Sequence, residues 1–248
     1  MFRSSIAAIA VLSLFVVTAS GQGSLPKAWS RSFFAKPPFR AGLDWAVLYK
    51  DNPSLSISAA FPHPTQLGPG LFTAKFSVTS GLQQAIKADR YRAQRVRWSG
   101  YLRTLDVGSV WNDDPTGETR TVASRDSSPG AGLYVVIDSR DAIVLYAMTR
   151  DRLTGAHDWT KVEMVFDVPS PSVLITLGVF LAGKGQLWAS GFAFEEVSSS
   201  VPSTSDLDLT GTQICDYTFA AHKQRLKEYR RSPDVPVLQI QGRRPKSP

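Results

Sequence analysis

The chain has 248 residues, a formal net charge of +7 and a single cysteine, Cys215. One cysteine excludes an internal disulfide, so the fold must be stabilised by the burial of apolar side chains. The length allows one domain of about 150–200 residues with flanking segments.

The positive charge is concentrated at the C-terminal end of the chain. Residues 222–248 hold eight Lys or Arg and two acidic residues, whereas residues 22–221 hold 19 of each and are neutral. A domain that follows a phosphate backbone concentrates its cations on the folded body. The neutral body therefore argues against nucleic-acid binding, although residues 90–104 combine arginines with aromatic rings as a single-strand groove does.

Residues 1–21 have the pattern of a secretory signal peptide. Arg3 supplies a positive start, residues 6–17 are apolar except for one serine, and the small residues of VTASG follow. About twelve apolar residues are too few to span a bilayer, which needs about 20. We therefore expect a cleaved signal peptide, a secreted or periplasmic location, and no transmembrane segment.

Residues 22–40 form a lead-in rich in Pro, Ser and Lys, and residues 41–197 show short apolar runs separated by turn signals. The predicted strands are 44–49, 54–60, 71–78, 94–104, 131–137, 142–149, 159–167, 173–182 and 186–196. Many short strands with frequent turns are typical of an antiparallel β-sandwich.

Three further segments flank or interrupt this pattern. The polar loop 108–130 is longer than most hairpin connections, a length that is usually functional or disordered. Residues 198–215 have the composition of a linker. Residues 216–248 form a basic tail, for which we predict a short amphipathic helix followed by disorder.

Alternation within two predicted strands assigns their side chains to opposite faces. In residues 94–104, Val96, Trp98, Gly100 and Leu102 share one face, and Arg97, Ser99, Tyr101 and Arg103 share the other. In residues 131–138, Leu133, Val135 and Ile137 oppose Tyr134, Val136 and Asp138. We assign the apolar row of the first strand to the core, with Trp98 pointing inward.

Three segments together resemble a bacterial galactose-binding-like or carbohydrate-binding-module-like jelly-roll module. They are LQQAIKADRYRAQRVRWSGYLRT (82–104), AGLYVVID (131–138), and the stretch from HDWTKVEMVFDVP to ITLGVFLAGKGQLWASGFAFEEV (157–197). The resemblance implies an all-β fold, an antiparallel jelly-roll β-sandwich of eight or nine strands. It also implies that Trp159 and Trp188 are core residues beside the last strands.

In some members of this module, the resemblance implies a structural calcium ion or a sugar on a concave face. The chain departs from the module at three places. Ala189-Ser190-Gly191 stand where members carry paired acids, Tyr134 replaces a tryptophan, and the loop 108–130 is longer than usual.

Sugar recognition needs an aromatic platform and hydrogen-bonding side chains beside it. The candidate ligand-binding residues are Tyr101, Tyr134, Arg97, Arg103, Asp138 and Trp111. The two tyrosines would stack on a sugar if their strands share a sheet, and Trp111 in the long loop would close over one end. The alternative is a solvated sheet face with structural aromatics.

The densest local set of acidic residues lies in the long loop and gives weak metal candidates. Asp113, Asp114 and Glu118, with Asn112, supply the oxygen atoms that Ca²⁺ prefers, but not at the spacing of an EF-hand. A solvated loop is the alternative, and it is the interpretation that we favour. We predict no cofactor, and a structural calcium ion is the one exception that the loop allows.

No catalytic signature is present in the sequence. The three histidines, His63, His157 and His222, are not part of a G-x-S-x-G or H-E-x-x-H motif. The spacing of the carboxylates does not identify the pair that a glycosidase needs.

The sequence therefore predicts an exported, non-catalytic binding module for a carbohydrate or a cell-envelope ligand. A structural or protein-interaction module that docks through the basic tail, and a small glycan-active hydrolase, are the two alternatives.

Overall fold

In the computed structural model, the described residues are 24–32, 39–59, 79–108, 129–204, 222–227 and 229–240. The strands are β1 (Ser30–Arg31), β2 (Phe39–Tyr49), β3 (Asn52–Ala59), β4 (Thr79–Lys87), β5 (Arg95–Gly108), β6 (Gly130–Asp138), β7 (Ile143–Met148), β8 (Gly155–Asp167), β9 (Leu174–Ala182) and β10 (Lys184–Glu196). Residues 222–227 are helical, and η3 (Tyr229–Arg231) is a 3-10 turn. Within these ranges no helix is long and apolar enough to cross a membrane.

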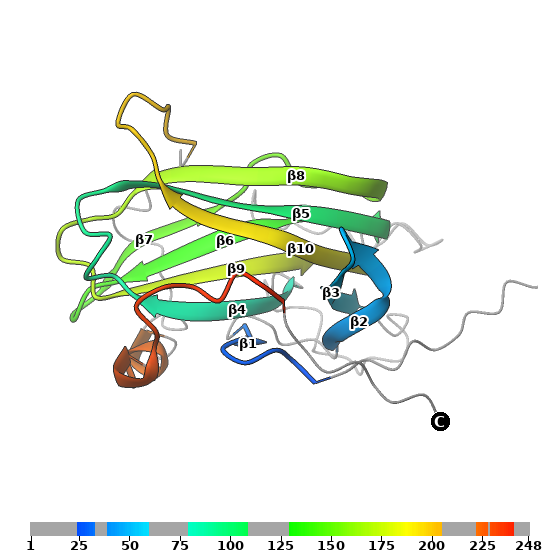
Figure 1. Ribbon diagram of the computed structural model, residues 1–248, viewed down its shortest axis with the longest axis horizontal. Coiled ribbons are helices and arrows are strands. Elements are labelled where there is room, and N and C mark those ends of the chain that lie inside the picture. The colour runs from blue at the N-terminus through cyan, green and yellow to red at the C-terminus, as the bar shows by residue number, and fades with distance from the viewer. Residues whose placement is uncertain are drawn as a thin grey trace, which may run out of the picture.

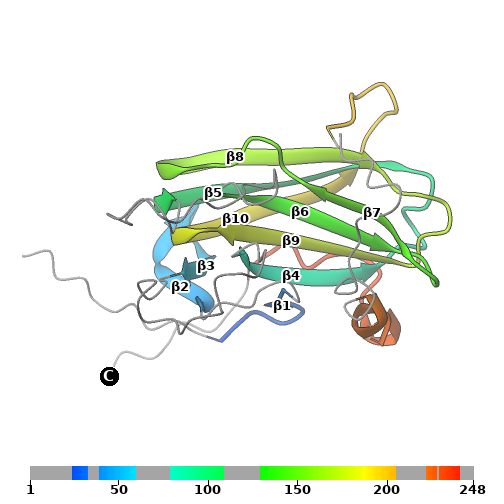
Figure 2. The ribbon, with the colours of Figure 1, turned by 180° about the vertical axis from the view of Figure 1, so that it is seen from behind.

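The strands form two antiparallel sheets that pack face to face (Figures 1 and 2). Their orders are β2-β3-β10-β5-β8 (the first sheet) and β1-β4-β9-β6-β7 (the second sheet). Without the edge strands β1 and β2, the order β3-β10-β5-β8 lies opposite β4-β9-β6-β7. Each early strand is thus paired with a late one, which is the nested order of a jelly roll. The predicted all-β jelly-roll sandwich is confirmed.

Most predicted strands correspond to observed ones, with ends shifted by a few residues. The predicted strand 71–78 lies outside the described residues. The sequence missed β4, whose core-facing row contains Gln84 between the fully buried Leu82 and Ile86. A polar residue in the inward row hides the alternation that reveals a strand.

The core is built around β5. Val96, Trp98 and Leu102 are completely buried, as the alternation predicts. The Trp98 ring stacks on Phe192 of β10 with 5.1 Å between ring centroids and 14° between ring planes. Aromatic pairs of this kind contribute roughly 0.5–1.5 kcal/mol beyond the burial of their area.

Residues 233–240 pack along β4, so the predicted disorder of the tail is wrong for residues 232–240. Pro233 accepts a hydrogen bond from the Lys87 backbone N–H at 2.9 Å. The Gln84 side-chain amide pairs with the Val237 backbone, accepting from its N–H at 2.9 Å and donating to its carbonyl at 3.4 Å. Ile240 is 4% exposed and belongs to the main core. The composition is that of a disordered end, but these contacts offset the entropy of ordering it.

A buried ionic cluster fixes the helix 222–227 to β6. Asp138 is completely buried, and Arg225 donates to both of its carboxylate oxygens at 2.7 Å. The His222 Nδ1 lies 2.7 Å from the same carboxylate. We call Asp138, His222 and Arg225 the clasp. It corrects one prediction, since Asp138 is buried and does not lie on an open face of the sheet.

The start of the predicted linker is also part of the fold. The Arg95 guanidinium forms a two-point pair with Asp167 at 2.7 Å and donates to the carbonyls of Ser199 and Val201. The Thr204 backbone N–H donates to the Val165 carbonyl at 2.9 Å. Residues 198–204 therefore cover the edge of β8, and the domain extends beyond the predicted boundary at residue 197.

Asp138→Ala should lower the free energy of unfolding by about 3–5 kcal/mol, because it leaves the buried Arg225 without a counter-charge. Urea denaturation measures this change. Asp141→Ala, at an exposed position in the following turn, is the matched control and should change the value by less than about 0.5 kcal/mol. Equal effects of the two substitutions would show that the clasp does not stabilise the fold.

Candidate functional site

The outward-facing row of β5 is where the sequence placed three of its ligand-binding candidates. Arg97, Tyr101 and Arg103 lie on this row, opposite the buried Trp98 and Leu102. Tyr101 is half-buried, whereas the Arg103 side chain is 46% exposed. This part of the predicted arrangement agrees with the structure.

Tyr134 and Asp138 do not join that row, because β6 belongs to the second sheet and β5 to the first. The predicted shared surface of Tyr101 and Tyr134 is therefore wrong. Tyr134 is 3% exposed, and its hydroxyl donates to the Gln83 Oε1 at 2.8 Å. The alternation correctly placed both residues away from the core, but other parts of the chain bury that face of the sheet.

Tyr101 instead meets a tyrosine from the β2–β3 hairpin. The two turn residues, Lys50 and Asp51, have φ angles of 47° and 64°. Positive φ at both positions defines a type I′ turn, whose twist matches that of the paired strands. The ring of Tyr49 at the hairpin end stacks on Tyr101 with centroids 4.5 Å apart and 24° between planes.

Trp159 of β8 completes this group of rings. Its centroid lies 5.2 Å from that of Tyr49, with 61° between the planes, an edge-to-face contact. Tyr49, Tyr101 and Trp159 are each half-buried. We call these three residues the aromatic cluster. Its members come from β2, β5 and β8. In the sheet, β3 and β10 lie between β2 and β5, so the end of the β2–β3 hairpin must fold over β10 to reach Tyr101.

A bulge in β10 makes room for the hairpin end. The pairing with β5 shifts between Ser190 and Ala193, which leaves Gly191 in a left-handed conformation with φ of +60°. A Cβ atom at Gly191 would lie 2.6 Å from the Tyr49 ring and 3.1 Å from the Tyr101 ring. Glycine is thus required at position 191 both by the left-handed backbone and by the lack of space for a Cβ atom.

A second indole stands beside the cluster on the same face of the sheet. Trp188 pairs in register with Arg103, and its Nε1 donates to the Asp44 Oδ2 at 2.9 Å. The other oxygen of Asp44 accepts from the backbone N–H groups of Ala46 and Val47 at 2.8 and 3.2 Å. Asp44 thereby fixes both the irregular bend of β2 and the orientation of the Trp188 ring.

The expectation that Trp159 and Trp188 are core residues is wrong. Both are half-exposed, and neither belongs to the packed core. Their strands alternate, and Leu187 and Met164 take the inward positions on the same strands. Sequence reasoning also missed Tyr49 and Asp44, although the turn residues that follow Tyr49 signal a hairpin.

Charged side chains border the aromatic cluster. Arg103 lies 3.8 Å from Asp158, whose side chain is 88% exposed. Farther along β5, Arg97 pairs with Glu195 at 3.2 Å. The Lys161 ammonium, 2.7 Å from Glu163, holds the pKa of that carboxyl below its usual range. Arg97 is thus engaged by acids, while Arg103 and Asp158 form a more exposed ion pair at the border of the cluster.

The phenol of Tyr49 is held in its neutral form. Loss of solvation and, after it, the neighbouring Tyr101 raise the pKa of Tyr49 to about 12. The hydroxyl therefore keeps its proton, and its capacity to donate a hydrogen bond, at every physiological pH.

The remaining site candidates are not tested by these contacts. Trp111, Asp113, Asp114 and Glu118 lie outside the described residues. Among the residues that are described, no group of three or more His, Cys, Asp or Glu side chains is arranged to hold a metal ion. His157 is exposed and lies against the Thr154 carbonyl.

No protein-family model matches the chain. The curated protein YbfP of Bacillus subtilis, named as an uncharacterized HTH-type transcriptional regulator, is 33% identical over 149 residues. The matched stretch is 59% of this chain and 43% of that protein, so the chain spans less than half of this relative.

Solved structures similar to the chain include two carbohydrate-binding modules and a phage protein. The CBM22-1 xylan-binding domain from Paenibacillus barcinonensis has a TM-score of 0.41 and 12% identity, over 72% of this chain and 92% of that one. A C-terminal family 22 carbohydrate binding module of Clostridium thermocellum has a TM-score of 0.44 and 10% identity, over 74% and 98%. The enzymatically active domain of tailspike protein 4 of bacteriophage CBA120 has a TM-score of 0.42 and 7% identity, over 69% and 20%. The jelly-roll fold that the sequence motifs implied is itself established by the strand order of the two sheets.

Gly191→Ala should disrupt the aromatic cluster, because the added methyl group meets two rings. Gly155→Ala is a matched control, since Gly155 also has a positive φ of +75° but has open space around its Cβ position. The control should cost about 1–2 kcal/mol for the left-handed backbone alone. Gly191→Ala should cost more and should change the near-ultraviolet circular dichroism of the aromatic rings. Identical costs and an unchanged spectrum would mean that the rings do not need this close approach.

Spectrophotometric titration should detect the ionisation of Tyr49 near pH 12. The Tyr49→Phe variant identifies this signal, because the variant should lack it. Folding raises this pKa above the ordinary value of 10.0, so the protonated phenol of Tyr49 stabilises the folded state. This stabilisation is complete below pH 10 and declines as the pH rises to about 12. Tyr101→Phe should lower the pKa of Tyr49, since Tyr101 contributes to the shift. A Tyr49 midpoint near 10 in the unmodified protein would contradict the packing of the two phenols.

Proposed function

We propose that the protein is a binding module for a carbohydrate or a glycan of the cell envelope, and that the ligand is held on the aromatic cluster. The observation that carries the proposal is the contact of Tyr101 with Tyr49 and of Tyr49 with Trp159 on the outward face of the first sheet. The function is the one expected from the sequence, but the proposed surface replaces Tyr134 by Tyr49 and Trp159.

The chemistry of the cluster suits a sugar. The C–H face of a sugar ring packs on aromatic rings, while its hydroxyl groups need donors and acceptors at the border. Half-buried rings supply the first requirement, and the exposed Arg103 and Asp158 supply the second. The neutral Tyr49 phenol adds a hydroxyl that both donates and accepts.

Three described features hold the parts of this surface in place. The type I′ turn, the Gly191 bulge and the Asp44–Trp188 hydrogen bond each fix one part of it. A rigid surface loses little side-chain entropy on binding, which favours affinity from a small contact area.

We propose that the module is non-catalytic and exported. Asp44 accepts three hydrogen bonds and is not available as a general base, and Glu163 is paired with Lys161. The signal-like pattern of residues 1–21 supports the proposal of export. The similarity to part of a longer regulator is compatible with a module that is joined to different partner domains, so the proposal concerns the module alone.

A glycan array, followed by titration calorimetry with the strongest glycan, tests the proposal. Tyr101→Ala and Trp159→Ala should each weaken binding about tenfold, the loss expected for one stacking ring. Tyr146→Ala is the control, because Tyr146 is a half-buried aromatic residue on β7 of the second sheet. Thermal unfolding checks that each variant is folded. The proposal fails if the unmodified protein binds no glycan, or if Tyr146→Ala weakens binding as much as the two cluster variants.

A further inference from the structure

The clasp gives the helix 222–227 a defined inner side. His222 and Arg225 are three residues apart, point toward β6 and are 3% and 1% exposed. Side chains three or four positions apart lie on one side of a helix, so the positions between them face elsewhere. The basic segment is therefore held in one orientation relative to the second sheet.

The outer side of the same segment is cationic. Lys223 and Lys227 are four positions apart and exposed, and Arg230 and Arg231 on η3 are exposed as well. Residues 222–240 hold five Lys or Arg against Glu228 and Asp234. Of these five cations, only Arg225 is turned inward by the clasp.

Two acidic side chains that the structure describes in or beside the segment already have partners. Asp234 pairs with Lys87 at 3.0 Å, and Asp89 pairs with Arg92 at 2.6 Å. The described contacts therefore do not neutralise the cations of η3. Because residues 22–221 carry no net charge, the excess positive charge of residues 22–248 lies in the C-terminal part that contains this segment.

Two exposed apolar side chains follow the cations. Val235 and Val237 are 47% and 36% exposed, among the few large apolar side chains that the described residues leave in solvent. Their backbone is held against β4 by the contacts of Pro233 and Val237 described above. The chain thus fixes two valines in solvent within seven residues of Arg230.

We propose that residues 223–237 dock the protein on a membrane surface that carries acidic lipids. Exposed cations attract such a surface, and adjacent apolar side chains enter its headgroup region. A soluble polyanion would use the cations but not the valines. Binding of single-stranded nucleic acid would need stacking rings, and the one aromatic residue of the segment, Tyr229, is half-buried with its hydroxyl directed to Asp89.

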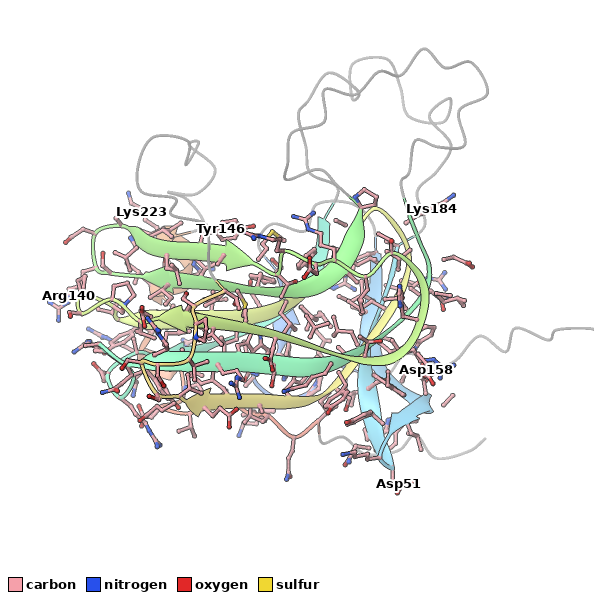
Figure 3. All side chains as sticks on the ribbon, turned by 90° about the horizontal axis from the view of Figure 1, so that it is seen from above. Asp51, Arg140, Tyr146, Asp158, Lys184 and Lys223 are labelled. Carbon is pink, nitrogen blue, oxygen red and sulfur yellow. The ribbon has the colours of Figure 1, made fainter. Side chains whose placement is uncertain are left out.

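This surface is separate from the aromatic cluster. In Figure 3, Lys223 lies at the end of the sandwich opposite to Asp51 and Asp158, and Figure 1 shows the helix at the far end of β4 from the β2–β3 hairpin. Membrane docking therefore does not depend on the proposed carbohydrate binding, and each can fail without the other.

Co-sedimentation of the full chain with phosphatidylcholine vesicles, with and without phosphatidylglycerol, tests the proposal. Each cation near the surface contributes roughly a fivefold increase in partitioning. Reversal of three cations (Lys227→Glu, Arg230→Glu and Arg231→Glu) should lower binding to acidic vesicles at least about a hundredfold. The control reverses Lys27, Arg40 and Arg150, which are exposed elsewhere, and should retain most of the binding. Both variants carry the same net charge, so a non-specific charge effect would reduce them equally and would overturn the proposal.

A second pair of variants distinguishes a membrane from a soluble polyanion. Val235→Ser with Val237→Ser should weaken binding to acidic vesicles several-fold and leave binding to inorganic polyphosphate unchanged. Tyr101→Ala should leave vesicle binding unchanged. The proposal is overturned if acidic vesicles do not bind, or if the valine variant binds them as well as the unmodified protein does.

Discussion

The bulge in β10 is the constraint on which both the core and the outward face of the first sheet depend. Ser190 and Ala193 pair with Tyr101 and Ser99, so two residues of β10 occupy the space opposite a single residue of β5. One of the two, Phe192, turns inward and stacks on Trp98. The other, Gly191, faces outward beneath the Tyr49 and Tyr101 rings. A regular strand would lose either the core aromatic pair or the space for the hairpin.

The clasp has the corresponding role for the second sheet. A fully buried carboxylate is unfavourable unless charged donors satisfy it, and Asp138 receives them only when residues 222–225 are in place. The same alternation that turns Asp138 away from the core thus requires a covering segment. Covering this face from the C-terminal end directs Lys227 and the arginines of η3 into solvent.

The sequence predicted the features that depend on periodicity and missed those that depend on distant partners. Alternation in β5 and β6 assigned every side chain to the correct side of its sheet, and Trp98 to the core. It did not show that β5 and β6 belong to different sheets, because pairing is decided between strands far apart in the chain. The order of residues 232–240 was missed for the same reason, since Gln84 and the core around Ile240 stabilise it. The hydrogen bond between Asp44 and Trp188 joins residues 144 positions apart, so no local sequence pattern predicts it.

The outward faces of the two sheets differ in how completely other parts of the chain cover them. Tyr134 is hydrogen-bonded within the second sheet and is almost without solvent contact. On the first sheet, the hairpin end covers Tyr101 only in part and adds a ring of its own. A hairpin that ended in alanine or serine would also cover this face, but it would add no aromatic ring on which another ring could stack. Tyr49 at the end of β2 therefore packs on the sheet and also leaves a ring surface that is partly open to solvent.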